Sequence, residues 1–170
     1  EAGKRQRKVL LLDHSNKVGK KILMSGGGRC NFTNYHISHD KYLSDNPHFM
    51  KSALSRYTQW DFIGLVSDYE IPFHEKTLGQ LFCDNKASDI VKILLAECDK
   101  YSVEIKLNTI VSKLDKISDD IFQINTKEQI YNCKSLVIAT GGLSIPTMGA
   151  TGFGYNIAKQ FGITLNPQYA

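Results

Sequence analysis

The sequence has few cysteines and prolines, and it lacks long apolar runs. Its 170 residues include 4 cysteines, 4 prolines and 1 tryptophan. The cysteines lie far apart and none forms a C-x-x-C pair, which argues against a disulfide framework and favours a reduced, cytoplasmic location. No apolar stretch reaches the about 18 residues that a membrane span needs, and no signal peptide is recognisable, so we expect no membrane partner.

The charge is also unremarkable for a soluble globular domain. The formal net charge is +4, with 42% hydrophobic and 22% charged residues. The densest basic cluster, KRQRK at residues 4–8, is not followed by interleaved aromatic residues, so we expect it to be a solvated surface and predict no nucleic-acid partner. His36 and His39 form an H-x-x-H pair without an acid or thiolate at ligand spacing. This pattern favours an exposed loop, and we predict no metal site.

The chain alternates between strand and helix patterns. The apolar run at residues 9–12 ends at Asp13 and is typical of a parallel strand buried on both faces. Apolar stripes and capping signals predict helices that begin near Pro47, Thr58, Ser88 and Gly154, the last ending at Gly162. A period of two from Val103 to about Ile130 predicts a meander of short strands. A second buried run, SLVIAT at residues 135–140, precedes Gly141 and Gly142.

Each apolar run is followed by residues suited to ligand binding at the carboxyl end of its predicted strand. These are Asp13 after the first run, and Gly141 and Gly142 after the second. Ligands of open parallel α/β sheets bind beyond these ends, because helix N-termini and loop amides converge there. An acid at the tip of a Rossmann strand accepts hydrogen bonds from both ribose hydroxyls of an adenosine, and Asp13 is placed for that role. The usual glycine-rich first turn does not precede it. Either the sequence begins inside a domain, or it is not a Rossmann unit.

Two motifs decide between these readings. GKKILMSGGGRCNFTN (residues 19–34) and ATGGLSIPTMGATGFGYNIAKQFG (residues 139–162) resemble two signatures of the aminoacetone-oxidase-like family of FAD-dependent oxidoreductases, which includes bile-acid 3-dehydro reductases. The resemblance implies an α/β fold: an FAD/NAD(P)-binding Rossmann-like domain with a parallel sheet and a β-meander, truncated at both ends. We expect a partial FAD-binding domain over residues 1–165 and the start of an inserted substrate domain at residues 166–170.

The resemblance gives the glycines of the first motif a reason. A flavin and its pyrophosphate are flat, bulky and anionic, and backbone amides approach them closely only where no Cβ intervenes. The candidate cofactor-binding residues are Asp13, Lys21, Ser25, Gly26, Gly27, Gly28, Arg29, Cys30, Asn31, Val111, Ala139, Thr140, Gly141 and Gly142.

Different chemistry is expected of the side chains in this set. Ser25 and Asn31 can donate hydrogen bonds, while Arg29 or Lys21 can offset phosphate charge or an electron-rich reduced flavin. We expect Cys30 to pack closely against the flavin.

The remaining assignments come from relatives of the family. The resemblance implies that Thr140 bonds the cofactor, together with its neighbours in the A-T-G-G sequence. In related flavoproteins the backbone of a strand residue near the position of Val111 reads the adenine edge; an ordinary strand valine is a nearly equal alternative. No side chain stands out as catalytic.

The implied function is an FAD-dependent oxidoreductase. It would transfer a hydride or electron pairs between a small organic substrate and a nicotinamide cofactor or oxygen, with NADH or NADPH as an electron donor. The alternative is a non-catalytic Rossmann module that binds a nucleotide or S-adenosylmethionine, in which Asp13 also holds a ribose. A yellow protein that releases flavin on denaturation would favour the first reading. The oligomeric state stays open.

Overall fold

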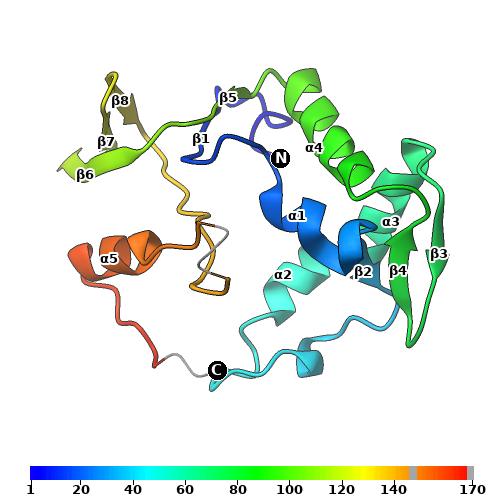
Figure 1. Cartoon of the computed structure of the whole chain (residues 1–170). Coiled ribbons are helices and arrows are strands. Elements are labelled where there is room, and N and C mark those ends of the chain that lie inside the picture. The colour runs from blue at the N-terminus through cyan, green and yellow to red at the C-terminus, as the bar shows by residue number, and fades with distance from the viewer. Residues whose placement is uncertain (146–148, 168–170) are drawn as a thin grey trace. The chain divides into compact units, whose positions relative to one another are not determined.

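The computed structural model describes residues 1–145 and 149–167, and the chain divides into two compact units (Figure 1). The first unit comprises residues 1–9 and 19–104, and the second comprises residues 10–18 and 105–170. The expected start of an inserted domain at residues 166–170 therefore lies partly outside the described residues. The same is true of residues 146–148 within the second motif.

The first unit contains a three-stranded antiparallel sheet of order β2-β4-β3. Its elements are α1 (Lys20–Met24), the 3₁₀ turn η1 (Ser25–Gly28), β2 (Asn31–Asn34), η2 (His39–Lys41), α2 (Lys51–Arg56), α3 (Gln59–Asp68), β3 (Phe73–Glu75), β4 (Gln80–Cys83) and α4 (Ser88–Lys100). Asn31 pairs with Phe82 and Thr33 with Leu81, with a register shift between the two pairs. The glycine motif therefore lies where α1 ends and this sheet begins.

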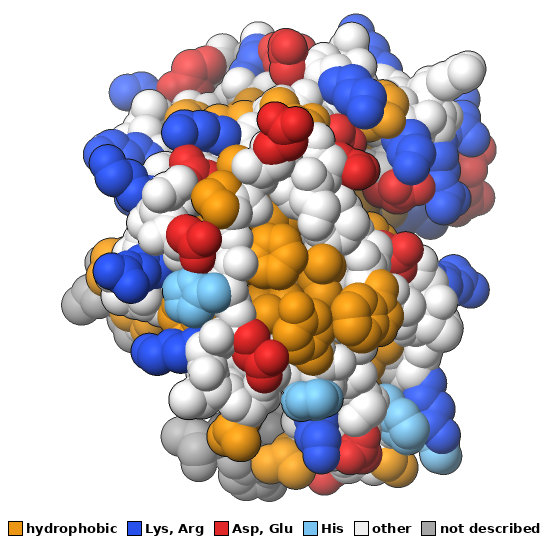
Figure 2. Space-filling model, turned by 90° about the vertical axis from the view of Figure 1, so that its right-hand side faces the viewer, with side chains coloured by type: hydrophobic (Ala, Val, Ile, Leu, Met, Phe, Trp, Pro, Cys, Tyr) orange, Lys and Arg blue, Asp and Glu red, His pale blue; other side chains and the backbone are white. Residues whose placement is uncertain are grey.

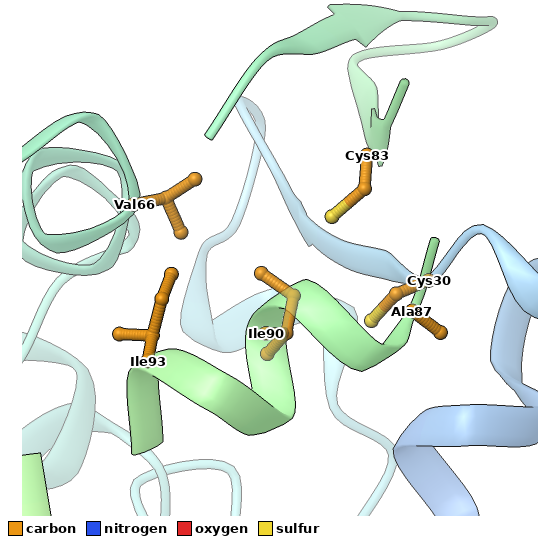
Figure 3. Close-up of a cluster of buried hydrophobic side chains, with 6 residues drawn as sticks. All are labelled: Cys30, Val66, Cys83, Ala87, Ile90 and Ile93. Atoms are coloured by element: carbon orange, nitrogen blue, oxygen red, sulfur yellow. The ribbon is translucent and has the colours of Figure 1, made fainter. Parts of the chain in front are cut away.

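The core of the first unit forms where α3 and α4 meet the sheet (Figure 3). Its buried members are Cys30, Val66, Cys83, Ala87, Ile90 and Ile93. α4 contributes Ile90 and Ile93 from the apolar stripe expected of a helix beginning near Ser88. Because these side chains exclude water together, the core links the end of the glycine motif to both long helices.

The start of α3 confirms the capping box expected from Thr58 and Asp61. The Asp61 amide donates to Thr58 Oγ1 at 3.2 Å, and the Thr58 amide donates to Asp61 Oδ2 at 2.7 Å. The hydrogen bonds from Thr58 also lower the pKa of the Asp61 carboxyl. Two amides that the first helical turn would leave unpaired are thereby satisfied.

We expect Thr58→Ala to lower the free energy of unfolding of the full-length protein by about 1 kcal/mol, because an N-cap hydrogen bond is lost. Since the folded-state pKa of Asp61 is lowered, its contribution is present above the unfolded-state pKa and disappears as the pH falls through the lowered value. Denaturant unfolding at neutral and acidic pH should therefore show a difference that narrows in acid. Thr58→Ser, which keeps the hydroxyl, is the control; an equal loss there would contradict the capping role.

The second unit contains a parallel strand pair, a meander and a helix. Its elements are β1 (Leu10–Leu12), β6 (Val111–Ser118), β7 (Ile121–Thr126), β8 (Ile130–Cys133) and α5 (Phe153–Gln160), and β5 (Glu104–Lys106) begins at the boundary with the first unit. The Glu104 amide donates to the Val9 carbonyl and the Asp13 amide to the Lys106 carbonyl. From the first of these hydrogen bonds to the second, the residue numbers increase on both strands. β1 and β5 therefore run parallel, as in a Rossmann domain.

The meander of β6, β7 and β8 packs against α5 through Leu114, Ile124 and Ile157. The helix ends as expected at Gly162, whose φ is +70°. The amides of Gly162 and Ile163 donate back to the carbonyls of Lys159 and Ala158, a glycine-terminated helix end.

Three expectations about strands were wrong. The alternation that begins at Val103 does not open the meander, because β5 pairs with β1 instead. Leu11 is 40% exposed, so β1 is not buried on both faces. Residues 135–140 form no strand, and Val137 is 83% exposed. A parallel strand is buried only when strands and helices cover it, and no strand among the described residues pairs with this run.

The described part of the chain has neither a membrane-spanning helix nor a cluster of metal-ligating side chains. Residues 1–145 and 149–167 contain no helix that is both long and apolar enough to cross a membrane. The same residues contain no group of three or more metal-ligating side chains.

Candidate functional site

The glycines of the first motif have two different structural roles. Gly26, Gly27 and Gly28 have φ values of +56°, +66° and +90°, in the left-handed region that other residues rarely adopt. A Cβ on Gly26 would lie 2.6 Å from a ring carbon of Phe82 and 2.8 Å from the Asn31 amide nitrogen. Gly26 is therefore required by packing. A Cβ on Gly27 or Gly28 would meet no described atom within 4 Å, so these two glycines leave open space beside the backbone.

The loop that carries these glycines is tied to the rest of the first unit. The Cys30 amide donates to the Ser25 carbonyl at 3.1 Å, which closes the turn. The Ala87 amide donates to the Gly28 carbonyl at 2.7 Å, and the Cys83 amide to the Arg29 carbonyl at 3.1 Å. These bonds fix the loop to β4 and to the start of α4. The open space beside Gly27 and Gly28 thus belongs to a positioned backbone.

The polar side chains of the motif differ from what the sequence suggested. Ser25 Oγ donates its only proton to the Ile22 carbonyl at 2.9 Å, so it can accept but not donate further. When the Asn31 amide is oriented to satisfy both of its atoms, its nitrogen donates to the carbonyls of Thr33 and Leu81. Both side chains therefore serve the local fold first. The Arg29 side chain is exposed and forms no ion pair with a described residue, which leaves its charge available to an anion.

A pocket of about 280 Å³ opens beside the motif. Its lining residues are Lys21, Ile22, Ser25, Cys30, Asn31, Phe32, Phe62, Ile90 and Leu94. The structure therefore brings together four of the predicted site residues: Lys21, Ser25, Cys30 and Asn31. The apolar lining from Phe32, α3 and α4 was missed, because the helical stripes were interpreted as core packing alone. The combination of apolar walls with a few polar groups is typical of small-molecule sites.

Cys30 lies within the protein core as well as beside the pocket. Its residue is 4% exposed, its φ is +55°, and it belongs to the cluster that includes Cys83 (Figure 3). Burial, and to a smaller extent the neighbouring Cys30, raises the pKa of the Cys83 thiol to about 11. Cys83 is therefore a neutral thiol at physiological pH and is not activated for nucleophilic chemistry.

Asp13 is held at the end of β1 in the second unit. Its Oδ1 accepts the Ser15 amide at 2.8 Å, and its carbonyl accepts the Thr109 amide at 2.9 Å. His14 Nδ1 lies 3.8 Å from the same Oδ1. The carboxylate thus caps the turn that follows the strand, while no described residue bonds its Oδ2. One oxygen is structural, and the other can accept a hydrogen bond from a ligand.

The second motif surrounds the start of α5. Ala139, Thr140 and Gly141 are exposed, and a Cβ on Gly141 would meet no described atom within 4 Å. A Cβ on Gly154 would lie 2.8 Å from Thr140 Oγ1, and a Cβ on Gly142 would lie 3.1 Å from the Tyr155 hydroxyl. Glycines 142 and 154 therefore permit close packing between residues 140–142 and the helix.

Val111 begins β6, opposite Thr126, at a register shift. Its side chain packs against the cluster of Leu114, Ile124 and Ile157, as expected of an ordinary strand valine. The suggested contact of its backbone with adenine stays a prediction. The predicted site residues thus form two groups, one on each unit, with Asp13, Val111 and residues 139–142 on the second.

The parallel pair of β1 and β5, with antiparallel sheets and helices in the same chain, is the mixed α/β architecture of a Rossmann domain. The chain belongs to the family described as the HI0933-like protein Rossmann domain, whose model matches residues 1–168. The family expected from the two motifs is thereby confirmed at this broader level.

Curated relatives extend this relation. Proteins named ribosomal RNA dihydrouridine synthase from Haemophilus influenzae and Escherichia coli are each 53% identical over 169 residues, covering 96% and 99% of this chain. A 3-dehydro-bile acid delta(4,6)-reductase from Clostridium scindens is 28% identical over 160 residues, covering 94% of this chain and 39% of its own length. The chain spans 42% of the length of each of the two synthases.

These relatives correct one prediction. From the sequence we predicted a small-molecule substrate and no nucleic-acid partner, but the two 53% identical relatives carry the name of an enzyme that acts on ribosomal RNA. The error came from judging only the basic cluster at residues 4–8.

Proposed function

We propose that this chain is the FAD-binding part of an enzyme that reduces uridine to dihydrouridine in ribosomal RNA. The observation that carries the proposal is the 53% identity to two synthases of that name over nearly the whole chain. Because the chain spans 42% of their length, the complete activity belongs to the longer protein. NADH or NADPH is the proposed source of the electron pair.

Residues of the first motif, and separately Asp13 on the second unit, have the chemistry that this cofactor needs. Gly27 and Gly28 leave space where a flat, anionic group can approach the backbone, and the next residue, Arg29, is exposed and forms no ion pair with a described residue. Oδ2 of Asp13, which no described residue bonds, suits a ribose hydroxyl, while Oδ1 keeps the carboxylate oriented. When bound, the flavin would supply the electron pair that saturates the C5–C6 bond of uracil. The protein would hold the cofactor and position the base.

The direct test uses the full-length protein and an unmodified ribosomal RNA transcript. We expect a yellow protein whose flavin is released on denaturation and identified as FAD. With NADH or NADPH it should convert uridine to dihydrouridine, detected by mass spectrometry of the RNA nucleosides. A colourless protein that takes up no FAD would favour the non-catalytic nucleotide-binding module. A yellow protein that leaves uridine unchanged would instead show that the substrate is wrong.

A further inference from the structure

The turn between β3 and β4 presents a leucine to solvent in a disfavoured conformation. Leu78 has a φ of +53° and Gly79 a φ of +78°, and the Gln80 amide donates to the Thr77 carbonyl at 3.0 Å. The left-handed conformation is unfavourable for leucine, and Leu78 is 87% exposed. An exposed apolar side chain on a backbone that would suit glycine or asparagine points to a role other than packing.

The end of β2 holds this turn in place. Asn34 Nδ2 donates to the Leu78 carbonyl at 2.9 Å, while Asn34 Oδ1 accepts the His36 amide at 2.7 Å. The Tyr35 amide donates to the Gly79 carbonyl at 2.9 Å. The His36 ring packs so closely on Gly79 that a Cβ there would lie 2.6 Å from it. The backbone that carries Leu78 is therefore held in place by the end of β2.

A pocket of about 390 Å³ lies beside this turn, entirely within the first unit. Its lining residues are Asn34, His36, Ile37, Lys41, Tyr42 and Leu78. This volume falls in the range of about 300–1,000 Å³ that is usual for small-molecule sites. Tyr42 and Leu78 offer apolar surfaces, and Lys41 offers a cation whose partner, Asp40 at 3.3 Å, is also exposed. Such surface pairs are weak, so a phosphate can compete for the lysine.

The chain that follows the pocket alternates between aromatic and basic residues. Phe49 and Trp60 are 71% and 58% exposed, and α2 between them buries no residue. Lys51 and Arg56 form no ion pair with a described residue. On the face that carries β3 and β4, hydrophobic side chains gather at the centre with histidines beside them (Figure 2). Basic groups interleaved with exposed aromatic rings are typical of surfaces that bind unpaired nucleotides.

We propose that this pocket binds an unpaired nucleotide of the RNA substrate, with its base between Tyr42 and Leu78 and its phosphate near Lys41. The inference rests on the proposed function and names the surface that would receive the RNA. The pocket is a binding subsite and not the place of reduction. Changes to it should therefore raise the KM for RNA and leave kcat unaltered.

The test compares Tyr42→Ala and Leu78→Gly in the full-length protein with a control, Leu95→Ala, which shortens a part-exposed leucine on α4. Leu78→Gly removes the side chain and relieves the left-handed backbone, so the fold should survive or gain stability. Loss of one stacked base should weaken affinity for a ribosomal RNA fragment with an unpaired loop by about 5- to 150-fold. Flavin content and the kcat at saturating RNA should match the wild type, as should every property of Leu95→Ala.

The salt dependence gives an independent readout. Lys41→Ala should reduce the slope of log affinity against log salt concentration by about 0.7, because one phosphate contact with a single strand is lost. Lys127→Ala, at the exposed turn between β7 and β8, should leave the slope unchanged.

Three results would overturn the inference. If the wild type binds and reduces ribosomal RNA while Tyr42→Ala and Leu78→Gly bind it equally well, the pocket is not the RNA subsite, although the proposed function stands. If the wild type holds flavin but neither binds nor reduces ribosomal RNA, both proposals fail. If the variants keep RNA affinity but dissociate an oligomer on size-exclusion chromatography, the surface is a protein interface.

Discussion

Gly27→Val is expected to abolish flavin retention by the full-length protein while leaving it folded. The Gly27 backbone is held by the bonds that tie residues 25–30 to β4 and α4, and its Cβ position faces open space. If FAD occupies that space, an isopropyl group displaces it by direct overlap. The substitution also carries a backbone cost, because a valine at φ +66° is disfavoured by about 1–2 kcal/mol.

Gly162→Val provides a matched control for that backbone cost. Gly162 has a φ of +70°, and a Cβ there would likewise meet no described atom within 4 Å, but it terminates α5 and is no part of the proposed site. Both variants should show a similar fall in melting temperature, and Gly27→Val alone should lose flavin. The ratio of flavin to protein absorbance after dialysis measures the difference. A fully loaded Gly27→Val protein would place the cofactor elsewhere.

Asp13→Ala is expected to weaken FAD binding by about 10- to 150-fold, because hydrogen bonds to a charged acceptor are worth about 1.5–3 kcal/mol. The flavin should be lost on dialysis and regained at excess FAD. The melting temperature should fall as well, since Oδ1 no longer accepts the Ser15 amide. A cap of this kind contributes about 1 kcal/mol. Stability and cofactor binding therefore change together in this variant.

Asp13→Asn separates the two roles of the carboxylate. The amide oxygen can still accept the Ser15 amide, so stability should stay near that of the wild type. The amide nitrogen that replaces Oδ2 is a donor and cannot accept a ribose hydroxyl bond, so FAD affinity should fall nearly as far as in Asp13→Ala. Isothermal titration with FAD and thermal unfolding of the same samples give both quantities. If Asp13→Asn bound FAD like the wild type, the acid would be a turn cap and nothing more.

Local signals in the sequence predicted the helices well. The Thr58 and Asp61 pair, the apolar stripe after Ser88 and the glycine after α5 each act within a few residues. The helix expected at Pro47 is shorter, because residues 47–50 form turns and α2 begins at Lys51. Hydrogen bonds between neighbours in the chain decide such features, so their residue types are visible in the sequence.

Contacts between distant residues could not be predicted in this way. An apolar run predicts a strand but not its partner, so β5 was assigned to the meander and residues 135–140 to a buried strand. Three adjacent glycines likewise look alike in the sequence. The ring of Phe82, more than fifty positions away, is one of the groups that make Gly26 a packing requirement, whereas Gly27 and Gly28 face open space.

The sequence by itself determined the family at the level of the HI0933-like Rossmann domain, the α/β class and the two motifs that carry the candidate cofactor site. Those properties depend on residue identity and short spacing, which fold into place through local backbone preferences. The tertiary structure decided that Phe82 packs on Gly26, that the Asn31 side chain bonds the Leu81 carbonyl, and that Tyr42 and Leu78 share a pocket. Such properties arise when chain segments far apart in sequence exclude water and satisfy one another's hydrogen bonds, which no local pattern encodes.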